Sequence, residues 1–350
     1  MLSHNYDMNV ARQLVAAGEY PAQHLYGASR LAELGHEVRI APIGSGAMRD
    51  FSYRLRLRAG EISTERAALR LAGDGAVLLA GEPTHAAGLV ALRRRRLVRA
   101  PLVGIFHQPV APTRWWTSLA RGFDCAVGLT EPVTRSLIAA GRSPDTTFAA
   151  PWGPDLSSPL YGPAPATPPR LVSTGKTGRD VETLLLALQT LDVEAKVFSL
   201  GVPAVVPGPR VVIADVREGA DAFGKRQYST ASVIDDVRSA GIVVIPIATP
   251  DSVVGLTELA DALALGRAVI HTRTPVWDLD ASRDGFGVSV DANDVSGLRA
   301  AITLLTSNDD LRAQAGKRAR ELAESSWNAS RFGDAVARAV MTAKELAVRM

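Results

Sequence analysis

The sequence predicts an α/β protein with two doubly wound parallel sheets, each covered by helices on both faces. Three observations support this fold class. Short apolar runs typical of buried strands alternate with segments of helical periodicity through the first half of the chain. Residues 151–169 are rich in proline and glycine and interrupt this alternation, which begins again at residue 170. A chain of 350 residues is also too long for one ordinary core and fits two domains.

In the first half, each expected strand is a short apolar run and the expected helices lie between the strands. The amphipathic pattern of residues 22–35, AQHLYGASRLAELG, predicts one helix that ends at Gly35. A strand at residues 37–43 should follow it. The opening residues MLSHN offer little apolar length, so the expected first strand is poorly defined. The other strands are expected at 76–80, 102–106 and 125–129, and the helices at 63–72, 84–96 and 131–141.

The second half repeats the pattern around one central strand. Residues 242–247 form an unbroken apolar run, mostly β-branched, which is typical of a strand buried on both faces of a parallel sheet. Further strands are expected at 170–174, 195–199, 210–214, 268–272 and 287–290, and helices at 180–191, 230–239, 256–265, 295–306, 309–325 and 328–347. The predicted organisation is therefore an N-terminal domain at 1–155, a linker at 151–169, a second domain at 170–327 and a C-terminal helix at 328–350 that returns to the first domain.

Composition excludes several classes of protein. Hydrophobic residues make up 47% of the chain and charged residues 21%, the balance of a soluble globular protein. No apolar run reaches the ~18 residues of a membrane span, and the N-terminus lacks the charged-then-apolar order of a signal peptide. The one cysteine, Cys125, should be a buried, inert thiol, which fits a reducing cytoplasm. His4, His85 and His271 have no partners at a metal-binding spacing, so we expect no metal site.

The arginines are clustered although the net charge is only +3. Arg93–Arg96 form a run, and Arg54, Arg56 and Arg58 alternate with other residues. One interpretation is a solvated helix end and an exposed strand face. The other is a basic surface that meets anionic lipid headgroups or a charged substrate, which would make the protein peripheral at the inner membrane face. No aromatic residues are interleaved with these arginines, so we expect no nucleic-acid partner.

The loop and helix after the central strand form the first candidate site. Gly255, Leu256 and Thr257 lie at the predicted helix N-terminus, where unpaired N–H groups and the helix dipole favour an anion. Gly255 has no Cβ, so a phosphate could approach its backbone closely. Asp261 follows about one turn later, and a carboxylate suits a pair of sugar hydroxyls. An anion and a diol together describe a nucleoside diphosphate with its ribose. The alternative is an ordinary crossover helix capped by Thr257, with Asp261 in solvent.

This segment resembles the donor site of GT-B glycosyltransferases of the retaining, glycogen-synthase-like superfamily, also called glycosyltransferase group 1. The residues that match are Gly255, Leu256, Thr257, Asp261, Ala262, Gly266, Val269, Ile270 and Thr272. Many members of that superfamily carry two glutamates eight positions apart, the second at the place of Asp261. Val253 stands eight residues before Asp261, so the first acid is absent or replaced, and Asp251 is the nearest candidate.

The sequence STGKTGRD, residues 173–180, is the second candidate site. A strand, a glycine turn and two cations before a helix suit a diphosphate, because Lys176 is a point charge and Arg179 can bond to two oxygens. Such a clamp stabilises a nucleoside diphosphate as it leaves. The loop resembles the superfamily's "GR…K" element, with Lys176 in place of arginine, Arg179 in place of lysine and a shorter spacing. The alternative is two solvated charges, with Asp180 as a helix cap.

Three residues of the first half are further candidates by resemblance. His107 follows the strand at 102–106, where a histidine of the family contacts the donor sugar near the reacting carbon. A neutral imidazole could donate to a sugar hydroxyl or stabilise developing charge there, so His107 is the predicted catalytic residue. His24 and Gly27 lie where the family has a loop that touches donor phosphate and acceptor. The alternative for the histidines is a structural role, with backbone partners.

The resemblance implies a hexosyltransferase-type enzyme with the GT-B fold, in which two Rossmann-like domains face a cleft. It would move a sugar from a nucleotide-diphosphate sugar to an acceptor hydroxyl with retention of configuration, without a metal or a cofactor. The acceptor could be a glycan, a lipid-linked molecule or a small molecule. A GT-B sugar-nucleotide epimerase is one alternative. A degenerate member that binds a nucleotide sugar without turnover is the other, and Val253 keeps it open.

Overall fold

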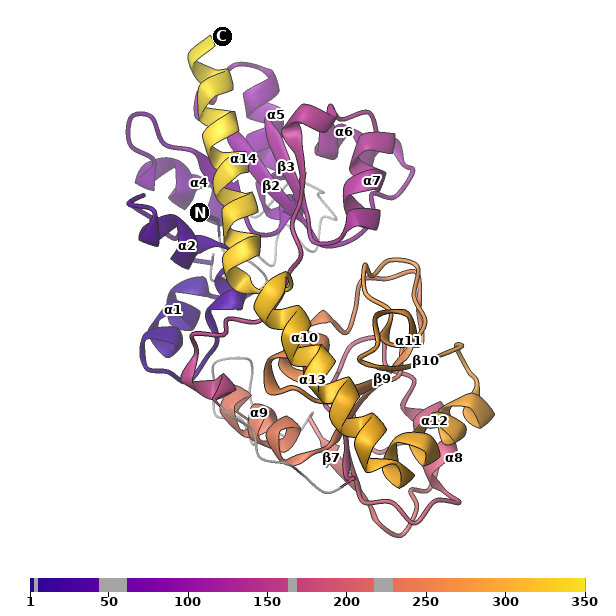
Figure 1. The fold of residues 1–350 in the computed structure, drawn as a ribbon. Coiled ribbons are helices and arrows are strands. Elements are labelled where there is room, and N and C mark those ends of the chain that lie inside the picture. The colour runs from indigo at the N-terminus through magenta and orange to yellow at the C-terminus, as the bar shows by residue number, and fades with distance from the viewer. Residues whose placement is uncertain (3–5, 44–61, 163–168, 217–228, 350) are drawn as a thin grey trace. The chain divides into compact units, whose positions relative to one another are not determined.

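The chain forms two compact units in the computed structural model, which describes residues 1–2, 6–43, 62–162, 169–216 and 229–349 (Figure 1). The first unit consists of Met1–Leu14, Ala22–Pro151 and Ala329–Met350. The second unit consists of Val15–Pro21 and Trp152–Asn328. Each unit contains one parallel sheet with helices packed against it.

The first unit has a four-stranded sheet whose strands pair in chain order. Its strands are β1 (Leu78–Ala80), β2 (Leu102–Phe106), β3 (Cys125–Gly128) and β4 (Thr147–Ala149), and all neighbouring pairs are parallel. Its helices are α1 (Met8–Ala16), η1 (Ala22–Leu25), α2 (Ala28–Glu33), α4 (Ile62–Leu71), η2 (Pro83–Ala86), α5 (Ala87–Arg94), α6 (Arg114–Arg121), α7 (Glu131–Ala139), η3 (Pro144–Thr146) and α14 (Ala329–Arg349). The last of these, α14, packs on β2, β3, β4 and α2.

The edge of this sheet near the N-terminus is formed by single bridges rather than by long ladders. Leu2 makes parallel bridges to Ala80 and to Ala41, and the Leu2 amide donates to the carbonyl oxygen of Leu79 at 2.8 Å. Within the described residues, the strand predicted at 37–43 therefore touches the sheet at Ala41. The predicted Arg54, Arg56 and Arg58 cluster lies outside the described residues.

The single helix predicted at residues 22–35 is wrong. The chain forms the 3₁₀ turn η1 and then the separate helix α2. Between them, Tyr26 has φ 48° and Gly27 has φ 84°, both in the left-handed region that a continuous right-handed helix excludes. Gly27 is required there for a second reason: a Cβ atom would lie 3.0 Å from Cβ of Val336 in α14. The apolar periodicity predicted helical structure here, but the close approach of α14 determines the backbone conformation at residues 26 and 27.

The second unit has a six-stranded parallel sheet in the order β10-β9-β8-β5-β6-β7. Its strands are β5 (Leu171–Ser173), β6 (Ala195–Ser199), β7 (Val211–Asp215), β8 (Ile242–Ile245), β9 (Ala268–Thr272) and β10 (Gly287–Val290). The chain runs outward from β5 to β7, then crosses back to β8 and runs outward on the other side. The order therefore reverses between β5 and β8, and ligands of such sheets bind outside the carboxyl ends of the strands at this reversal.

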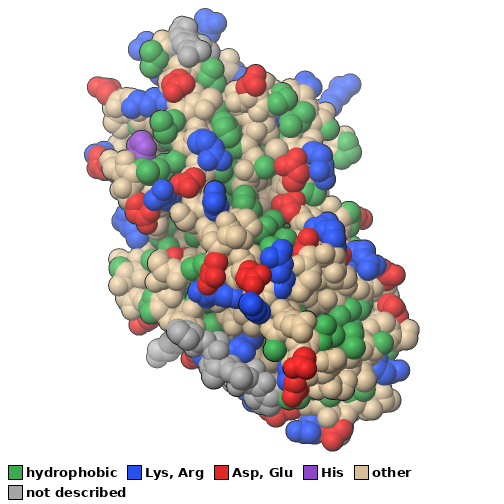
Figure 2. Space-filling model, viewed as in Figure 1, with side chains coloured by type: hydrophobic (Ala, Val, Ile, Leu, Met, Phe, Trp, Pro, Cys, Tyr) green, Lys and Arg blue, Asp and Glu red, His purple; other side chains and the backbone are tan. Residues whose placement is uncertain are grey.

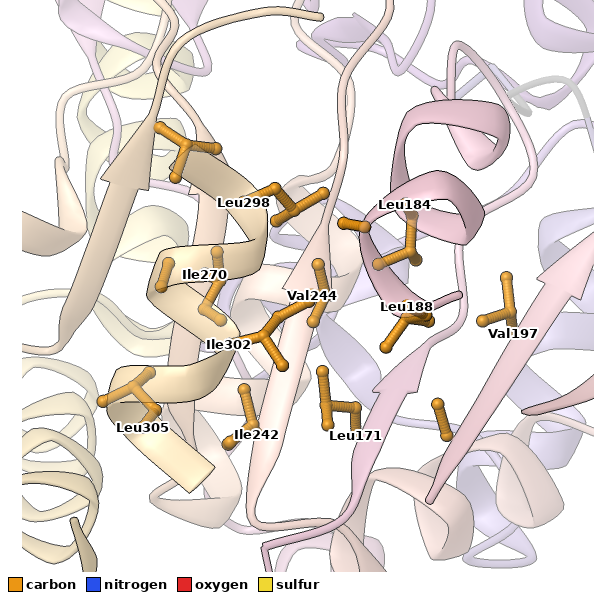
Figure 3. Close-up of a cluster of buried hydrophobic side chains, with 14 of the residues drawn as sticks. Leu171, Leu184, Leu188, Val197, Ile242, Val244, Ile270, Leu298, Ile302 and Leu305 are labelled. Atoms are coloured by element: carbon orange, nitrogen blue, oxygen red, sulfur yellow. The ribbon is translucent and has the colours of Figure 1, made fainter. Parts of the chain in front are cut away.

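Helices cover both faces of this sheet. They are η4 (Pro159–Tyr161), α8 (Val181–Leu188), α9 (Thr230–Ser239), α10 (Leu256–Leu265), α11 (Ala281–Asp284), α12 (Val295–Ser307) and α13 (Asp309–Ser325). Figure 3 shows the core under α8 and α12, where leucines from these helices meet Ile242, Val244 and Ile270 of the central strands. The helix α10 contacts β8, β9, α9 and α13.

Most predicted elements are confirmed. Strands 102–106, 195–199, 268–272 and 287–290 and helices 230–239, 256–265 and 309–325 have the predicted bounds. The prediction missed the helices α1 and α6. It also missed β4 and α11, because runs of three or four residues carry no usable periodicity. The predicted linker contains η4, whose first turn is capped by Ser158.

The core under α12 gives a stability prediction. Ile302 is fully buried in this cluster, and Ile302→Ala should lower the free energy of unfolding by roughly 2–5 kcal/mol, because it removes packed atoms and leaves a cavity. Leu304→Ala on the same helix is the control, since Leu304 is 44% exposed. Urea unfolding measures both variants, and equal losses would contradict the packing described here.

Candidate functional site

The loops that follow β5 and β8 are joined at the reversal point of the second sheet. The Asp180 amide donates to the carbonyl oxygen of Pro246 at 3.1 Å, and the Ala248 amide donates to that of Gly178 at 2.9 Å. Arg179 and Ile247 form an antiparallel bridge between these bonds. The predicted clamp loop and the loop before α10 therefore form one continuous surface at the carboxyl ends of the central strands.

The N-terminus of α10 has no side-chain cap. Its N-cap residue is Gly255, with φ 89°, and no side chain accepts a hydrogen bond from the first-turn amides at this position. The other α-helices described in this unit begin with a capping side chain, from Asp180, Ser229, Asp280, Asp294 and Asn308. Thr257 is exposed and does not cap the helix, which corrects the alternative interpretation of this segment.

Gly255 is required by packing as well as by its backbone angle. A Cβ atom at this position would lie 2.8 Å from Cζ2 of Trp277 and 2.9 Å from Cγ2 of Ile245. The Trp277 indole donates from Nε1 to the carbonyl oxygen of Val254 at 3.0 Å, so the ring is fixed against the start of α10. The absence of a side chain at Gly255 thus lets Trp277 close this side of the loop.

His271 packs against the Trp277 ring and helps to hold it in place. Its ring stacks on Trp277 with a centroid separation of 5.0 Å. Nε2 accepts from the Ala281 amide at 3.0 Å, so the ring proton is on Nδ1, which donates to the carbonyl oxygen of Thr272 at 2.8 Å. Burial lowers the pKa of His271, which keeps the ring neutral. Its role is structural.

A buried ion pair connects the clamp loop to α10. The Arg179 guanidinium donates from Nε and Nη2 to Oε1 of Glu258, at 2.9 and 2.5 Å. The Arg179 side chain is 4% exposed and that of Glu258 is 7% exposed. Nη1 of Arg179 also donates to the carbonyl oxygen of Thr177 at 2.7 Å. Gly175 leaves the room for this pair, because a Cβ there would lie 1.8 Å from Oε1 of Glu258.

The pair changes the charge balance that the sequence predicted for this loop. Both Lys176 and Arg179 were expected to bind a diphosphate. In the structure the charge of Arg179 is met by Glu258, whereas Lys176 is exposed at the tip of the loop. Asp180 caps α8 through the Thr183 amide at 3.1 Å, as predicted.

Asp261 is buried rather than solvated. It is 5% exposed, and its Oδ1 accepts from the Tyr161 hydroxyl at 2.6 Å. Burial raises the pKa of Asp261 to about 7, the Tyr161 hydrogen bond opposes this shift and the nearby Glu258 adds to it. Arg238 holds the Tyr161 turn in place, since it donates to the carbonyl oxygens of Leu160 and Gly162.

The first acid of the family's pair has no equivalent in a matching position. Val253 is buried, at 9% exposure, whereas Asp251 is exposed in the turn that precedes it. The nearest buried acid is Glu258, on the other side of Gly255 along the chain.

In the first unit, three predicted residues gather around Tyr26. The His107 ring meets the Tyr26 ring edge to face at 5.0 Å. Its Nε2 lies 2.6 Å from the carbonyl oxygen of Gly81, so Nε2 carries the proton and Nδ1 is the unprotonated nitrogen. Burial lowers the pKa of His107. His24 is 9% exposed, and burial lowers its pKa to about 4. Gly27 lies against α14, as described above.

Three residues of the second-unit site were not predicted from the sequence. Glu258 looked like an ordinary first-turn acid, and its one signal was a charge in an otherwise apolar helix. Tyr161 lay in the proline-rich linker, 100 positions from its partner Asp261. Trp277 followed a strand without any motif.

Three further expectations concern single features of the chain. Cys125 is buried, and burial raises the pKa of its thiol to about 11, so it is the inert thiol that was predicted. In the part of the chain that the structure describes, no three His, Cys, Asp or Glu side chains cluster as metal ligands would. None of the helices described there combines the length and the apolar character of a membrane span.

The ion pair gives a stability prediction. Arg179→Gln should lower the free energy of unfolding by roughly 3–5 kcal/mol, because it leaves the Glu258 carboxylate buried without a partner. Arg210→Gln breaks an exposed pair with Asp192 and should change the same quantity by less than about 1 kcal/mol. Removal of both charges, with Arg179→Met and Glu258→Leu, should recover most of the loss. Urea unfolding of the three variants tests the expectation. It is contradicted if Arg179→Gln and the double variant lose equal amounts of unfolding free energy.

Asp261 gives a prediction on pH. Its folded pKa of about 7 lies above the ordinary value of 3.8, so the native state binds the proton more tightly than the unfolded state does. The stability that this proton contributes, at most about 4 kcal/mol, is complete below pH ~4 and is lost as pH rises to ~7. Asp261→Asn should therefore become steadily more stable relative to wild type from pH ~4 to pH ~8. Asp192→Asn, at a side chain that is 86% exposed, is the control and should follow the wild-type curve.

Comparison with known proteins gives likeness in structure alone. No protein-family model matches the chain, and no curated protein matches its sequence. A sucrose-phosphate synthase from Thermosynechococcus elongatus matches with a TM-score of 0.67 and 15% identity, over 93% of each chain. HepE from Anabaena in complex with UDP matches with a TM-score of 0.62 and 14% identity, over 87% of this chain and 91% of HepE.

A third match is trehalose-6-phosphate from E. coli bound with UDP-2-fluoro glucose. It has a TM-score of 0.61 and 10% identity, over 85% of this chain and 79% of that chain. These matching proteins are GT-B glycosyltransferases. At such identities the likeness concerns the fold, and it agrees with the two parallel sheets described above. The chain therefore has the GT-B fold, with two Rossmann-like domains.

Proposed function

We propose that this protein is a nucleotide-sugar-dependent glycosyltransferase. One observation carries the proposal: the uncapped N-terminus of α10 lies beside the Lys176 loop at the reversal point of the second sheet. Amides without side-chain caps and an exposed ammonium group suit a diphosphate. Structures with the same fold support this reading, since HepE binds UDP and UDP-glucose.

In this proposal the donor diphosphate binds at Lys176 and at the first turn of α10, to Gly255, Leu256 and Thr257. Arg179 contributes by fixing the loop that carries Lys176, through its bonds to Glu258 and Thr177. As the sugar bond breaks, negative charge grows on the diphosphate, where the ammonium group and the helix dipole stabilise it. This chemistry requires neither a metal nor a cofactor.

The donor ribose would bind Asp261 in place of the Tyr161 hydroxyl. The carboxylate already accepts one short hydrogen bond at 2.6 Å, and a ribose hydroxyl offers the same chemistry. Binding then requires the Tyr161 side chain to turn away from α10. Burial raises the pKa of Asp261 to about 7, so this exchange would strengthen as the acid ionises.

His107 would act on the transferred sugar. Because Nε2 donates to Gly81, the neutral ring offers Nδ1 as an acceptor to a sugar hydroxyl, rather than the donor that the sequence analysis expected. His24 and Gly27 would shape the acceptor side of the same loop region. We further propose transfer of a hexosyl group to an acceptor hydroxyl, with retention of configuration.

A second candidate function has its own observation. The buried Arg179–Glu258 pair removes one cation from the predicted clamp, and Val253 replaces the first acid of the family pattern. These two departures favour a protein that binds a nucleotide sugar without turning it over.

The first experiment is a thermal-shift panel with UDP, GDP, ADP and dTDP and their sugars. One diphosphate at ~100 times its dissociation constant should stabilise wild type by about 2.7 kcal/mol. Lys176→Ala should lose this shift, because it removes the exposed cation, whereas the control Lys317→Ala on α13 should keep it. No shift by any nucleotide, or an equal shift in both variants, would refute the donor site.

Release of free nucleoside diphosphate separates the two candidate functions. With the nucleotide sugar that binds, a transferase releases diphosphate in the presence of acceptor or, more slowly, water. EDTA should not change that rate. Tight binding with no release above the buffer rate, over a panel of sugar and lipid-linked acceptors, identifies a binding protein instead.

A further inference from the structure

We propose that the first unit docks on an anionic lipid bilayer through a basic rim formed by the ends of α5 and α6. The rim consists of Arg94, Arg95, Arg96, Leu97, Arg99 and Arg121, all of which are exposed. This inference goes beyond the proposed function, and its test uses no nucleotide sugar.

The rim is one continuous surface. The Arg94 guanidinium donates from Nη1 to Oγ of Ser118 in α6 at 2.6 Å, and from Nη2 to the carbonyl oxygen of Ser118 at 2.7 Å. The helices α5 and α6 pack closely at Gly122, where a Cβ would lie 2.1 Å from Cγ1 of Val90. They are neighbours in Figure 1.

The rim rests on a rigid base. Arg93, the first arginine of the run, is 14% exposed and donates from Nε and Nη2 to the two oxygens of Asp124. It thus fixes the end of α5 to the segment before β3. Arg121 donates from Nε to the carbonyl oxygen of Ala140 at the end of α7. The charged groups are therefore presented by packed helix ends rather than by a loose loop.

The charges of the rim are not neutralised within the described part of the chain. None of its five arginines forms an ion pair there. In the second unit, by contrast, each arginine that is exposed among the described residues is paired with an acid: Arg210, Arg273, Arg283 and Arg318. Figure 2 shows acidic and basic side chains intermixed over the face in view. The rim brings together cations that have no acidic partner among the described residues, and such a surface complements an anionic one.

The backbone at the end of α5 gives a second, independent observation. Arg96 has φ 61°, in the left-handed region, at the position where glycine usually ends a helix. The Leu97 amide donates to the carbonyl oxygen of Leu92 at 3.0 Å, which completes this helix-ending turn. This left-handed conformation strains an arginine but would not strain a glycine. The local structure therefore does not explain why residue 96 is a charged residue. The turn places Leu97, at 69% exposure, among the arginines.

Cations around an exposed apolar side chain favour a bilayer surface over a soluble polyanion. The cations meet the headgroups while Leu97 enters the interface. The rim also lies near the amino ends of the strands of the first sheet, because α5 ends shortly before β2 begins and α6 ends shortly before β3 begins. His107 follows the carboxyl end of β2, so docking at the rim leaves that edge open.

Vesicle flotation of the full chain tests the proposal. At ~0.1 M salt, wild type should float with vesicles that contain about 30% phosphatidylglycerol and should remain behind with pure phosphatidylcholine. The rim variant combines Arg95→Gln, Arg96→Gly and Arg99→Gln. Each cation is worth about five-fold at an anionic surface, so the rim variant should bind roughly a hundred-fold more weakly.

A matched variant removes the same charge elsewhere, with Arg210→Gln, Arg283→Gln and Arg318→Gln at exposed paired positions of the second unit. Its affinity for the anionic vesicles should lie within a few-fold of the wild-type affinity. Equal loss in both triple variants, equal binding to neutral vesicles, or no flotation of wild type would overturn the proposal. Tighter binding of wild type to heparin or RNA at equal anionic charge would assign the rim to a soluble polyanion instead.

The single variant Arg96→Gly separates binding from folding. Its thermal unfolding midpoint should equal or exceed that of wild type, because glycine adopts φ 61° without strain. Its affinity for the anionic vesicles should nevertheless fall about five-fold. A variant that is as stable as wild type and binds equally well would contradict the role given to this residue.

Discussion

The ion pair between Arg179 and Glu258 is the constraint on which the second-unit site depends. It connects the loop after β5 to the helix after β8, at the point where the strand order reverses. Both side chains are almost fully buried, so either charge alone would be strongly unfavourable there. The pair explains why residue 175 is glycine and why Lys176, not Arg179, is the exposed cation of the loop. A diphosphate bound as proposed above would meet Lys176 and the N-terminus of α10.

The helix α10 carries two buried acids three positions apart, and each is met by a distant segment. Glu258 pairs with Arg179 from the loop after β5, and Asp261 accepts from Tyr161 of the linker. Because the two acids lie close together, Glu258 contributes to the raised pKa of Asp261. The charge of the site is therefore set by tertiary partners. Through Tyr161, the linker segment contacts the site directly.

The exposed arginines of the second unit differ from those at the ends of α5 and α6. In the described part of the second unit, each exposed arginine is paired with an acid, which weakens the electrostatic field around it. At the ends of α5 and α6 the five rim arginines form no ion pair within the described residues, and one of them occupies a strained backbone position. Folding energetics alone would favour glycine at that position and acids among the cations. The arrangement is therefore better explained by an external anionic surface than by stability of the fold.

The sequence by itself predicted most of the alternating elements, a division near residue 151 and a candidate site in the loops after two strands. These features follow from periodicity and turn chemistry, which act between residues close in the chain. Only the tertiary structure decided the break at Tyr26 and Gly27, where α14 approaches, and the partners of Arg179 and Asp261. Those partners lie 79 and 100 positions away, and burial, rather than any local pattern, determines whether a charged side chain is available to a ligand.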